Sequence, residues 1–404
     1  MKIVYLNPSG QMGGAERSLL DFMASLRAAD PRLTLQLIAG ADGALLDQAR
    51  ELGVEARALP YPRRLARLGD AGAGGQPRLL STLTRASLNA PSVALYIMRL
   101  RRALAAAAPD LIHTNGFKMH VLGVRAAPRN VPVLWHVHDY ISSRPLMARL
   151  MRMHAGRCAA AVANSRSVAD DVRAACGSGL KVYPIHNAVD LERFSPEGSA
   201  LDLDRLAGLV PPAHPVVRIG LVATMAQWKG HEVFLRAFKL LSGDPPVRGY
   251  LIGGPLYETA GSQSDPEDLR RLAARLGLTG CVGFTGFVDE PAAAMRALDV
   301  VVHASTQPEP FGLVIAEAMA CGRAVVVSSG GGTAEIVTPG DDALVHEAGS
   351  VTELAARMDQ LARNPTLRAA LGARAAQSAR RRFARARLAD QLMPIYRALL
   401  TEAA

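Results

Sequence analysis

The sequence has few aromatic residues, few cysteines and no long apolar run, and each shortage argues against one class of protein. Aromatic residues make up 5 % of the 404 residues, and the four cysteines, Cys158, Cys176, Cys281 and Cys321, include no C-x-x-C pair. Scattered cysteines favour reduced thiols in a cytoplasmic chain over a disulfide framework. Apolar stretches such as Leu104–Ala108 fall far below the ~18 residues that a membrane span requires.

What the sequence does contain is typical of a globular protein with two domains. Hydrophobic residues make up 49 % and charged residues 20 %, a balance that does not fit a disordered chain. A chain of this length exceeds what one hydrophobic core usually serves. The opening residues, MKIVYLNPSG, predict a short strand and not a signal peptide with its longer apolar centre.

The net charge of +10 lies in one half of the chain. Residues 1–195 contain 25 Lys and Arg against 14 Asp and Glu, whereas residues 196–404 contain 21 against 22. A basic half predicts affinity for a phosphorylated ligand, an anionic membrane surface or nucleic acid. An Arg-rich proteome is the plainer explanation, but it does not account for an imbalance confined to one half.

Short apolar runs alternate with helical patterns in both halves, which predicts βαβ units around parallel sheets. We expect strands at residues 3–6, 35–39, 111–113, 133–137, 160–163 and 182–185, and again at 218–223, 250–252, 283–286, 300–303 and 324–327. The predicted fold class is therefore α/β, with two tandem Rossmann-like doubly wound domains that face each other across a ligand-binding cleft.

The composition also predicts where the domains divide. We place the first domain at residues 1–195, a linker rich in Gly, Pro and Ser at 196–213, and the second domain at 214–380. The C-terminal helical segment, 381–404, is expected to pack back on the first domain. Residues 61–78 are rich in Gly, Ala and Arg and predict a mobile loop.

Two segments of the first half are candidates for ligand binding. Gly10, Gly13 and Gly14 follow the first predicted strand and precede a helix, where backbone can approach a phosphate. Their spacing is not G-x-G-x-x-G, and a tight structural turn fits equally well. His136 and His138 lie at the carboxyl end of a predicted strand, where open α/β sheets bind ligands. A buried, hydrogen-bonded histidine is an equal alternative, and no third ligand supports a zinc site.

The second half offers two carboxylates and a lysine. Pro310 and Gly312 place Glu309 on a loop, and Glu317 lies eight residues later on an apolar helix. A carboxylate there needs hydrogen-bond donors. Lys229 follows a predicted strand, where it would neutralise a diphosphate, although an exposed surface lysine is the simpler interpretation. The D-x-D sequence at residues 202–204 falls in the linker and is interpreted as a solvated or capping pair.

Together these segments resemble a known family. EPFGLVIAEAMACGRAVVVS (309–328) closely resembles the signature of the retaining, nucleotide-sugar-dependent glycosyltransferases of family four, the glycosyltransferase group 1 enzymes of GT-B fold. Residues 13–16, WHVHDY (135–140), ANSRSVADDV (163–172), IHNAVDLERFSP (185–196), LVATMAQWKGHEVFLRAF (221–238) and VGFTGFVDE (282–290) match further segments of the family in the same order.

The resemblance implies a donor site in the second domain. Glu309 would bond donor-sugar hydroxyls near the reacting carbon, and Glu317 the ribose hydroxyls. Lys229, with the backbone of Gly312 and Leu313, would hold the diphosphate leaving group. Family members generally need no metal, so no cofactor is expected.

Other positions follow from the same resemblance. His138 would lie beside the donor sugar, Gly13 and Gly14 would line the diphosphate and acceptor side, and Val288 would lie near the base through its backbone. Phe311 belongs to the same donor-binding loop as Glu309.

Two departures from the family pattern concern the turns. Thr224 stands where most members have a second diphosphate-binding arginine, and Ala188 stands where a glycine is usual.

The predicted function is transfer of a sugar from a UDP- or GDP-sugar to a saccharide or lipid-linked acceptor in cell-envelope or exopolysaccharide biosynthesis. We expect the protein to be cytoplasmic, with a peripheral contact between its basic first domain and the anionic inner face of the cytoplasmic membrane. A catalytically silent sugar-nucleotide-binding subunit, suggested by Thr224, and a nucleotide-sugar epimerase of GT-B fold are the alternatives. No nucleic-acid partner is expected, because the basic half lacks interleaved aromatic residues.

Overall fold

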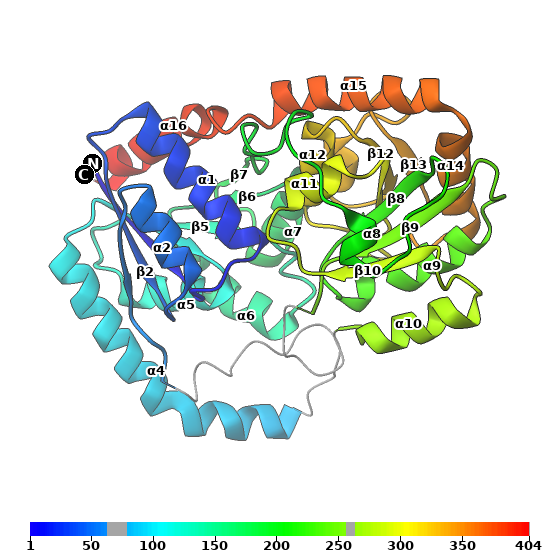
Figure 1. Cartoon of the computed structure of the whole chain (residues 1–404). Coiled ribbons are helices and arrows are strands. Elements are labelled where there is room, and N and C mark those ends of the chain that lie inside the picture. Colours follow the sequence, from blue (N-terminus) through cyan, green and yellow to red (C-terminus); the bar gives the residue numbers. More distant parts are fainter. Residues whose placement is uncertain (63–78, 256–262, 404) are drawn as a thin grey trace. The chain divides into compact units, whose positions relative to one another are not determined.

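The computed structural model describes residues 1–62, 79–255 and 263–403 (Figure 1). The chain divides into two compact units. Unit 1 consists of residues 1–188 and 385–404, and unit 2 of residues 189–384. The segment expected to form a mobile loop lies outside the described residues from residue 63 to residue 78.

Unit 1 is built on a seven-stranded parallel sheet of order β3-β2-β1-β4-β5-β6-β7. Every residue of β4 and β5 is buried, as expected of strands covered by helices on both faces. The strands are β1 Lys2–Asn7, β2 Thr34–Ala39, β3 Glu55–Ala58, β4 Leu111–Asn115, β5 Val133–Val137, β6 Ala160–Ala163 and β7 Val182–Pro184.

The helices of unit 1 come from both ends of the chain. They are α1 Gly14–Ala29, α2 Ala44–Glu51, α4 Leu79–Ala107, α5 Phe117–Ala126, α6 Pro145–His154, α7 Arg166–Cys176 and α16 Arg387–Ala403, with a 3-10 turn at Ala155–Arg157. Figure 1 shows α16 (red) beside α1 (blue). Leu388, Leu392 and Tyr396 of α16 are fully buried in the same apolar core as Phe22 of α1. The last helix therefore completes the core of unit 1.

Unit 2 repeats this plan with a six-stranded parallel sheet of order β10-β9-β8-β11-β12-β13. Its strands are β8 Val217–Val222, β9 Val247–Ile252, β10 Val282–Gly286, β11 Val300–His303, β12 Ala324–Ser328 and β13 Leu344–His346. Its helices are α8 Leu203–Leu206, α9 His231–Lys239, α10 Pro266–Arg275, α11 Pro291–Arg296, α12 Leu313–Ala320, α13 Thr333–Ile336, α14 Val351–Arg363 and α15 Pro365–Arg382, with a 3-10 turn, η2, at Gln227–Lys229.

In each sheet the strand order reverses at one point, between β1 and β4 in unit 1 and between β8 and β11 in unit 2. The chain leaves these two strands in opposite directions, so a crevice opens at their carboxyl ends. Two doubly wound α/β units confirm the predicted fold class. The edge strands β3 and β13 were not predicted, because β3 is only partly buried and both are very short.

The D-x-D sequence shows one clear error of interpretation. Asp202 does cap α8, accepting a hydrogen bond from the Arg205 backbone at 3.0 Å. Asp204, however, is neither solvated nor a cap, since it is only 4 % exposed. It binds both Arg218 and Arg248, which are neighbours in the β8–β9 register, as well as the hydroxyl of Tyr250.

Asp204 is a structural anchor. Burial alone would raise its pKa, but the hydrogen bonds from Tyr250, Arg248 and Arg218 outweigh burial and hold the pKa below its usual value. The carboxylate thus fastens α8 to the sheet of unit 2. It is not a metal ligand of the D-x-D kind.

Candidate functional site

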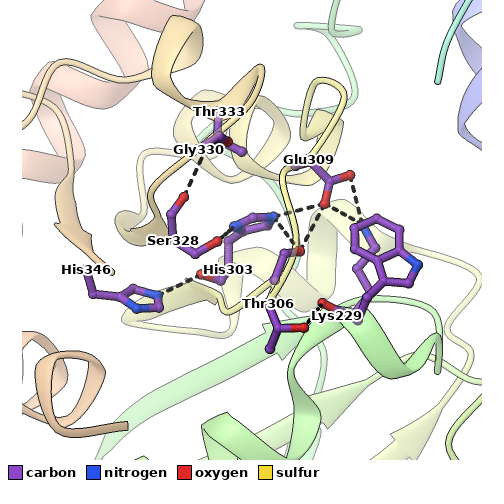
Figure 2. Close-up of polar contacts among 10 residues, drawn as sticks. Lys229, His303, Thr306, Glu309, Ser328, Gly330, Thr333 and His346 are labelled. Atoms are coloured by element: carbon purple, nitrogen blue, oxygen red, sulfur yellow. Dashed lines mark hydrogen bonds and ion pairs between the residues drawn. The ribbon is translucent and has the colours of Figure 1, made fainter. Parts of the chain in front are cut away.

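The strand reversal of unit 2 brings a lysine and a glutamate together. Lys229 ends η2, which follows β8, and Glu309 lies in the loop that follows β11. The Nζ atom of Lys229 is 2.9 Å from Oε1 and 2.8 Å from Oε2 of Glu309 (Figure 2). The side chains are 17 % and 10 % exposed. The structure thus unites two predicted site residues that are far apart in the sequence.

Two further side chains bind Glu309. The hydroxyl of Ser305 donates to Oε2 at 3.0 Å, and Nε2 of His303 lies 3.2 Å from the same oxygen. His303 is the last residue of β11, and its other ring nitrogen, Nδ1, is 3.0 Å from the hydroxyl of Ser328, the last residue of β12. Figure 2 shows His303 between Ser328 and Glu309. The carboxylate is therefore held by the sheet edge as well as by Lys229.

These contacts keep Glu309 ionised. Burial would raise its pKa, but the charge of Lys229 and the hydrogen bond from His303 outweigh burial and hold the pKa well below its usual value. A buried ion pair contributes little net stability, because desolvation of both ions offsets their attraction. The pair is therefore better explained by binding or catalysis than by folding.

The helix after Glu309 starts with a glycine that the geometry requires. Gly312 has φ +98° and is the N-cap of α12. A Cβ atom at Gly312 would lie 2.8 Å from Cδ1 of Ile315. Leu313 is the first helical residue, and Glu317 lies half-buried one turn further on. A helix N-terminus attracts anions, so the start of α12 suits a phosphate beside Lys229.

The remaining predicted residues of unit 2 differ in their surroundings. The ring of Phe311 is 2 % exposed and packs edge-on against Phe383, with ring centres 6.0 Å apart. Phe311 can therefore meet a ligand only through its backbone. Val288 is half-buried beyond β10, next to Phe287, which is 59 % exposed. Thr224 is half-buried in the turn between β8 and η2.

The strand reversal of unit 1 carries a chain of hydrogen bonds. Nε2 of His138 lies 2.5 Å from Oδ1 of Asn115, and Nδ2 of Asn115 donates to Oδ1 of Asn7 at 2.7 Å. Nδ2 of Asn7 in turn lies 3.2 Å from Glu16. The side chain of Asn164 donates to the carbonyl of His138 at 3.0 Å. Asn7 is the last residue of β1 and Asn115 is the last residue of β4, so these hydrogen bonds cross the point at which the strand order reverses.

The two candidate histidines have separate roles. His136 is fully buried, and its ring centre lies 3.9 Å from that of His138 and 4.4 Å from that of Phe22. Burial lowers the pKa of His136 well below its usual value and that of His138 to about 3. His136 is thus a neutral core residue, whereas His138 lies just beyond the carboxyl end of β5, the edge at which open α/β sheets bind ligands.

In the glycine loop before α1, one glycine is required by close packing and another has free space around it. A Cβ atom at Gly10 would collide with the backbone of Asp42. Gly13 is the N-cap of α1, and Gly14 is exposed, with no atom within 4 Å of its added Cβ. The tight turn therefore depends on Gly10, and Gly14 leaves free space at the start of the helix.

Sequence reasoning missed Asn7, Asn115, His303 and Ser328. Each is the polar last residue of a buried strand. That pattern was readable in the sequence, because the carboxyl ends of parallel strands share one edge of a sheet. Within the described residues, no group of three or more His, Cys, Asp or Glu side chains is placed to hold a metal ion.

Two doubly wound units, with an ion-paired lysine and glutamate at one reversal point, define an α/β protein whose polar side chains gather where open sheets of this kind bind ligands. Residues 12–193 match the family model described as Glycosyltransferase Family 4, and residues 216–378 match the model described as Glycosyl transferases group 1. The chain belongs to this family of glycosyltransferases.

Individual relatives agree with the family models. The chain is 27 % identical to HepE (Alr3699) of Anabaena, solved with UDP and glucose, with a TM-score of 0.79 over 98 % of this chain and 99 % of that one. It is 33 % identical to a D-inositol 3-phosphate glycosyltransferase of Streptomyces bingchenggensis over 54 % of this chain and 49 % of that protein. The match thus spans about half the length of this curated relative. Sucrose-phosphate synthase of Thermosynechococcus elongatus, at 19 % identity and a TM-score of 0.75 over 99 % of both chains, shares the fold.

Proposed function

We propose that the protein is a retaining, metal-independent glycosyltransferase that moves a sugar from a UDP- or GDP-sugar to a saccharide or lipid-linked acceptor, in cell-envelope or exopolysaccharide biosynthesis. The observation that carries this proposal is the largely buried ion pair of Lys229 and Glu309 beside the start of α12. Of the two bases, UDP has the better support, since the similar HepE structures hold UDP, UDP with glucose, or UDP-glucose.

Each group of this site has a chemical task in the transfer. The ammonium of Lys229 and the N-terminus of α12 stabilise the negative charge that develops on the departing diphosphate. An ionised Glu309 can only accept hydrogen bonds, which suits it to the hydroxyls of the donor sugar. We assign half-buried Glu317 to the ribose hydroxyls. In the front-face reaction that we propose, the acceptor oxygen bonds to the anomeric carbon as the bond to the phosphate breaks, and an oxygen of the leaving phosphate takes the proton of the acceptor hydroxyl.

Lys229 must change partner during this reaction. In the structure its ammonium binds Glu309 and lies 4.0 Å from the ring centre of Trp228. A diphosphate carries more negative charge than one carboxylate and attracts the ammonium more strongly. Donor binding therefore transfers Lys229, at least in part, from Glu309 to the phosphate.

The proposal includes a peripheral membrane contact of unit 1. Helix α6 exposes Leu146 (60 %) and Met153 (69 %) together with Arg149 and Arg152, and it contains no acidic residue. Cations near an anionic surface contribute about 1 kcal/mol each. No helix in the described ranges is long and apolar enough to span a bilayer. Cosedimentation with anionic vesicles tests the contact, and absence of binding at moderate salt would exclude it.

The activity is tested by nucleotide release from a panel of UDP-, GDP- and ADP-sugars, with and without candidate saccharide acceptors. We expect slow release of UDP or GDP that disappears in Glu309→Gln and persists in Glu51→Gln, a change at an exposed glutamate of α2. Tight binding without turnover, even with acceptors, would instead indicate the silent subunit that Thr224 suggests. An epimerised sugar nucleotide would indicate the epimerase.

A further inference from the structure

Glu309 receives hydrogen bonds from two further side chains in addition to its ion pair with Lys229. Its Oε2 atom receives Lys229 at 2.8 Å, Ser305 at 3.0 Å and His303 at 3.2 Å. Its backbone is also tied down, because the carbonyl of Glu309 accepts the Gly332 N–H at 2.7 Å. Withdrawal of Lys229 would leave the contacts of Ser305, His303 and Gly332.

The direction of each hydrogen bond can be assigned. An ionised carboxylate has no proton to donate, so Nε2 of His303 must carry the hydrogen that points to Glu309. The Ser305 hydroxyl also donates to Glu309, and its oxygen, 3.0 Å from Nε2, shares the imidazole hydrogen. In the neutral ring Nδ1 is then the acceptor, and the Ser328 hydroxyl donates to it.

His303 is held by its own strand end and by the ends of two other strands, one contacting its ring and one its backbone. His303 is 6 % exposed and Ser328 is 2 % exposed. Strand β13, the neighbour of β12, contributes His346. The Nε2 atom of His346 lies 3.2 Å from the carbonyl oxygen of His303. That contact reaches the backbone of His303 and not Glu309. A rigid sheet edge thus orients a carboxylate that itself lies on a loop (Figure 2).

We propose that His303 is a positioning residue for Glu309, oriented by Ser328, and that with Ser305 it keeps the carboxylate ionised and in place while Lys229 is engaged with the donor diphosphate. The part that concerns the diphosphate rests on the proposed function. The positioning of Glu309 by His303 does not, because its contacts join side chains of the protein itself.

The first test removes Lys229 and needs no donor. In Lys229→Met, the pKa of Glu309 is read by 13C NMR of its carboxyl carbon, assigned by its loss in Glu309→Gln. We expect Lys229→Met/His303→Leu to titrate at least about one pH unit higher than Lys229→Met. Adding His303→Gln, which keeps an N–H donor, should give an intermediate value. Equal pKa values in all three variants would overturn the proposal.

The second test separates positioning from folding. Binding of UDP and of UDP-glucose is measured by calorimetry for His303→Leu, His303→Gln and the surface control His214→Leu, an exposed histidine of unit 2. We expect His303→Leu to bind UDP within about twofold of the parent, to lose the additional affinity for UDP-glucose, and to hydrolyse it at least tenfold more slowly. His303→Gln should recover most of both.

The outcomes of the two tests are distinct. Equal weakening of UDP and UDP-glucose in His303→Leu, with a lowered Tm, would show a merely structural role and overturn the positioning. If the parent protein binds and hydrolyses no nucleotide sugar, the proposed function fails. The titration of Glu309 then still decides whether His303 acts on that carboxylate.

Discussion

Asn115 accepts a hydrogen bond from His138, with Oδ1 and Nε2 2.5 Å apart. Backbone carbonyls determine this direction. Nδ2 of Asn7 donates to the carbonyl of Ser9 at 2.6 Å, so the Oδ1 of Asn7 faces Asn115 and accepts from its Nδ2. Only Oδ1 of Asn115 then remains for the histidine. His138 is therefore held as the tautomer with its hydrogen on Nε2.

Asn115→Asp should raise the pKa of His138. Burial lowers that pKa to about 3 in the parent protein, and a carboxylate at hydrogen-bond distance favours the imidazolium by about one to three pH units. Imidazole 15N NMR titration measures the change, and Asn115→Leu serves as the control without a charge. A His138 that titrates identically in Asn115→Asp and Asn115→Leu would contradict the assigned hydrogen bond.

Unit 1 should lose stability in mild acid. Burial lowers the pKa values of four histidines, to about 3 for His113 and His138 and well below the usual value for His120 and His136. The unfolded chain takes up these protons near pH 6.5, while the native state does not. Their contribution is complete above pH 6.5 and falls as the pH drops towards 3, by up to about 1.4 kcal/mol per pH unit for each histidine.

Urea unfolding at pH 7 and pH 5 measures this loss. The two tryptophans lie one in each unit, so in a Trp228→Phe background the fluorescence of buried Trp135 reports unit 1. Adding His136→Phe keeps an aromatic ring against Phe22. It should remove the contribution of one histidine to the pH dependence of the unfolding free energy. An unchanged dependence would show that His136 does not stay neutral in the native state.

Substitutions at two glycines of the loop before α1 should have different effects, one on stability and the other on binding. Gly10→Ala drives a methyl group into the backbone of Asp42, and overpacking of this kind destabilises by about 1–3 kcal/mol. Gly14→Ala meets no atom and should leave the Tm unchanged while it weakens donor or acceptor binding. The Tm and the KM of both variants test this division. A large fall in Tm for Gly14→Ala would refute it.

Unit 2 should lose more stability when the Asp204 carboxylate is removed than when the neighbouring helix cap, Asp202, is removed. Asp204→Asn leaves Arg218 and Arg248 side by side without their partner, and breaking a buried ion pair costs about 3–5 kcal/mol. Asp202→Ala removes only a helix cap, worth about 1 kcal/mol. Thermal and urea unfolding compare the two, and equal losses would contradict the anchoring role.

The sequence predicted the α/β class because buried runs such as VLWHV and AVVVS repeat between helical stretches. It also identified Lys229 and Glu309 as candidates, although Lys229 taken singly was more simply interpreted as a surface lysine. Their pairing could not be predicted from spacing, because the order of strands in the sheet brings β8 beside β11. For the same reason, the partners of His303 and Asn115 emerge only when the strand order is known. Asp204 was misinterpreted because its arginine partners lie on strands further along the chain.

The return of α16 to unit 1 also sets the order in which the protein can be completed during synthesis. The hydroxyl of Tyr396 lies 2.6 Å from Nδ1 of His113, in the middle of the first sheet. Every residue of unit 2 leaves the ribosome before Tyr396 does. The domain that is translated first is therefore finished last, and the nascent chain must keep an open place in its first core until α16 arrives.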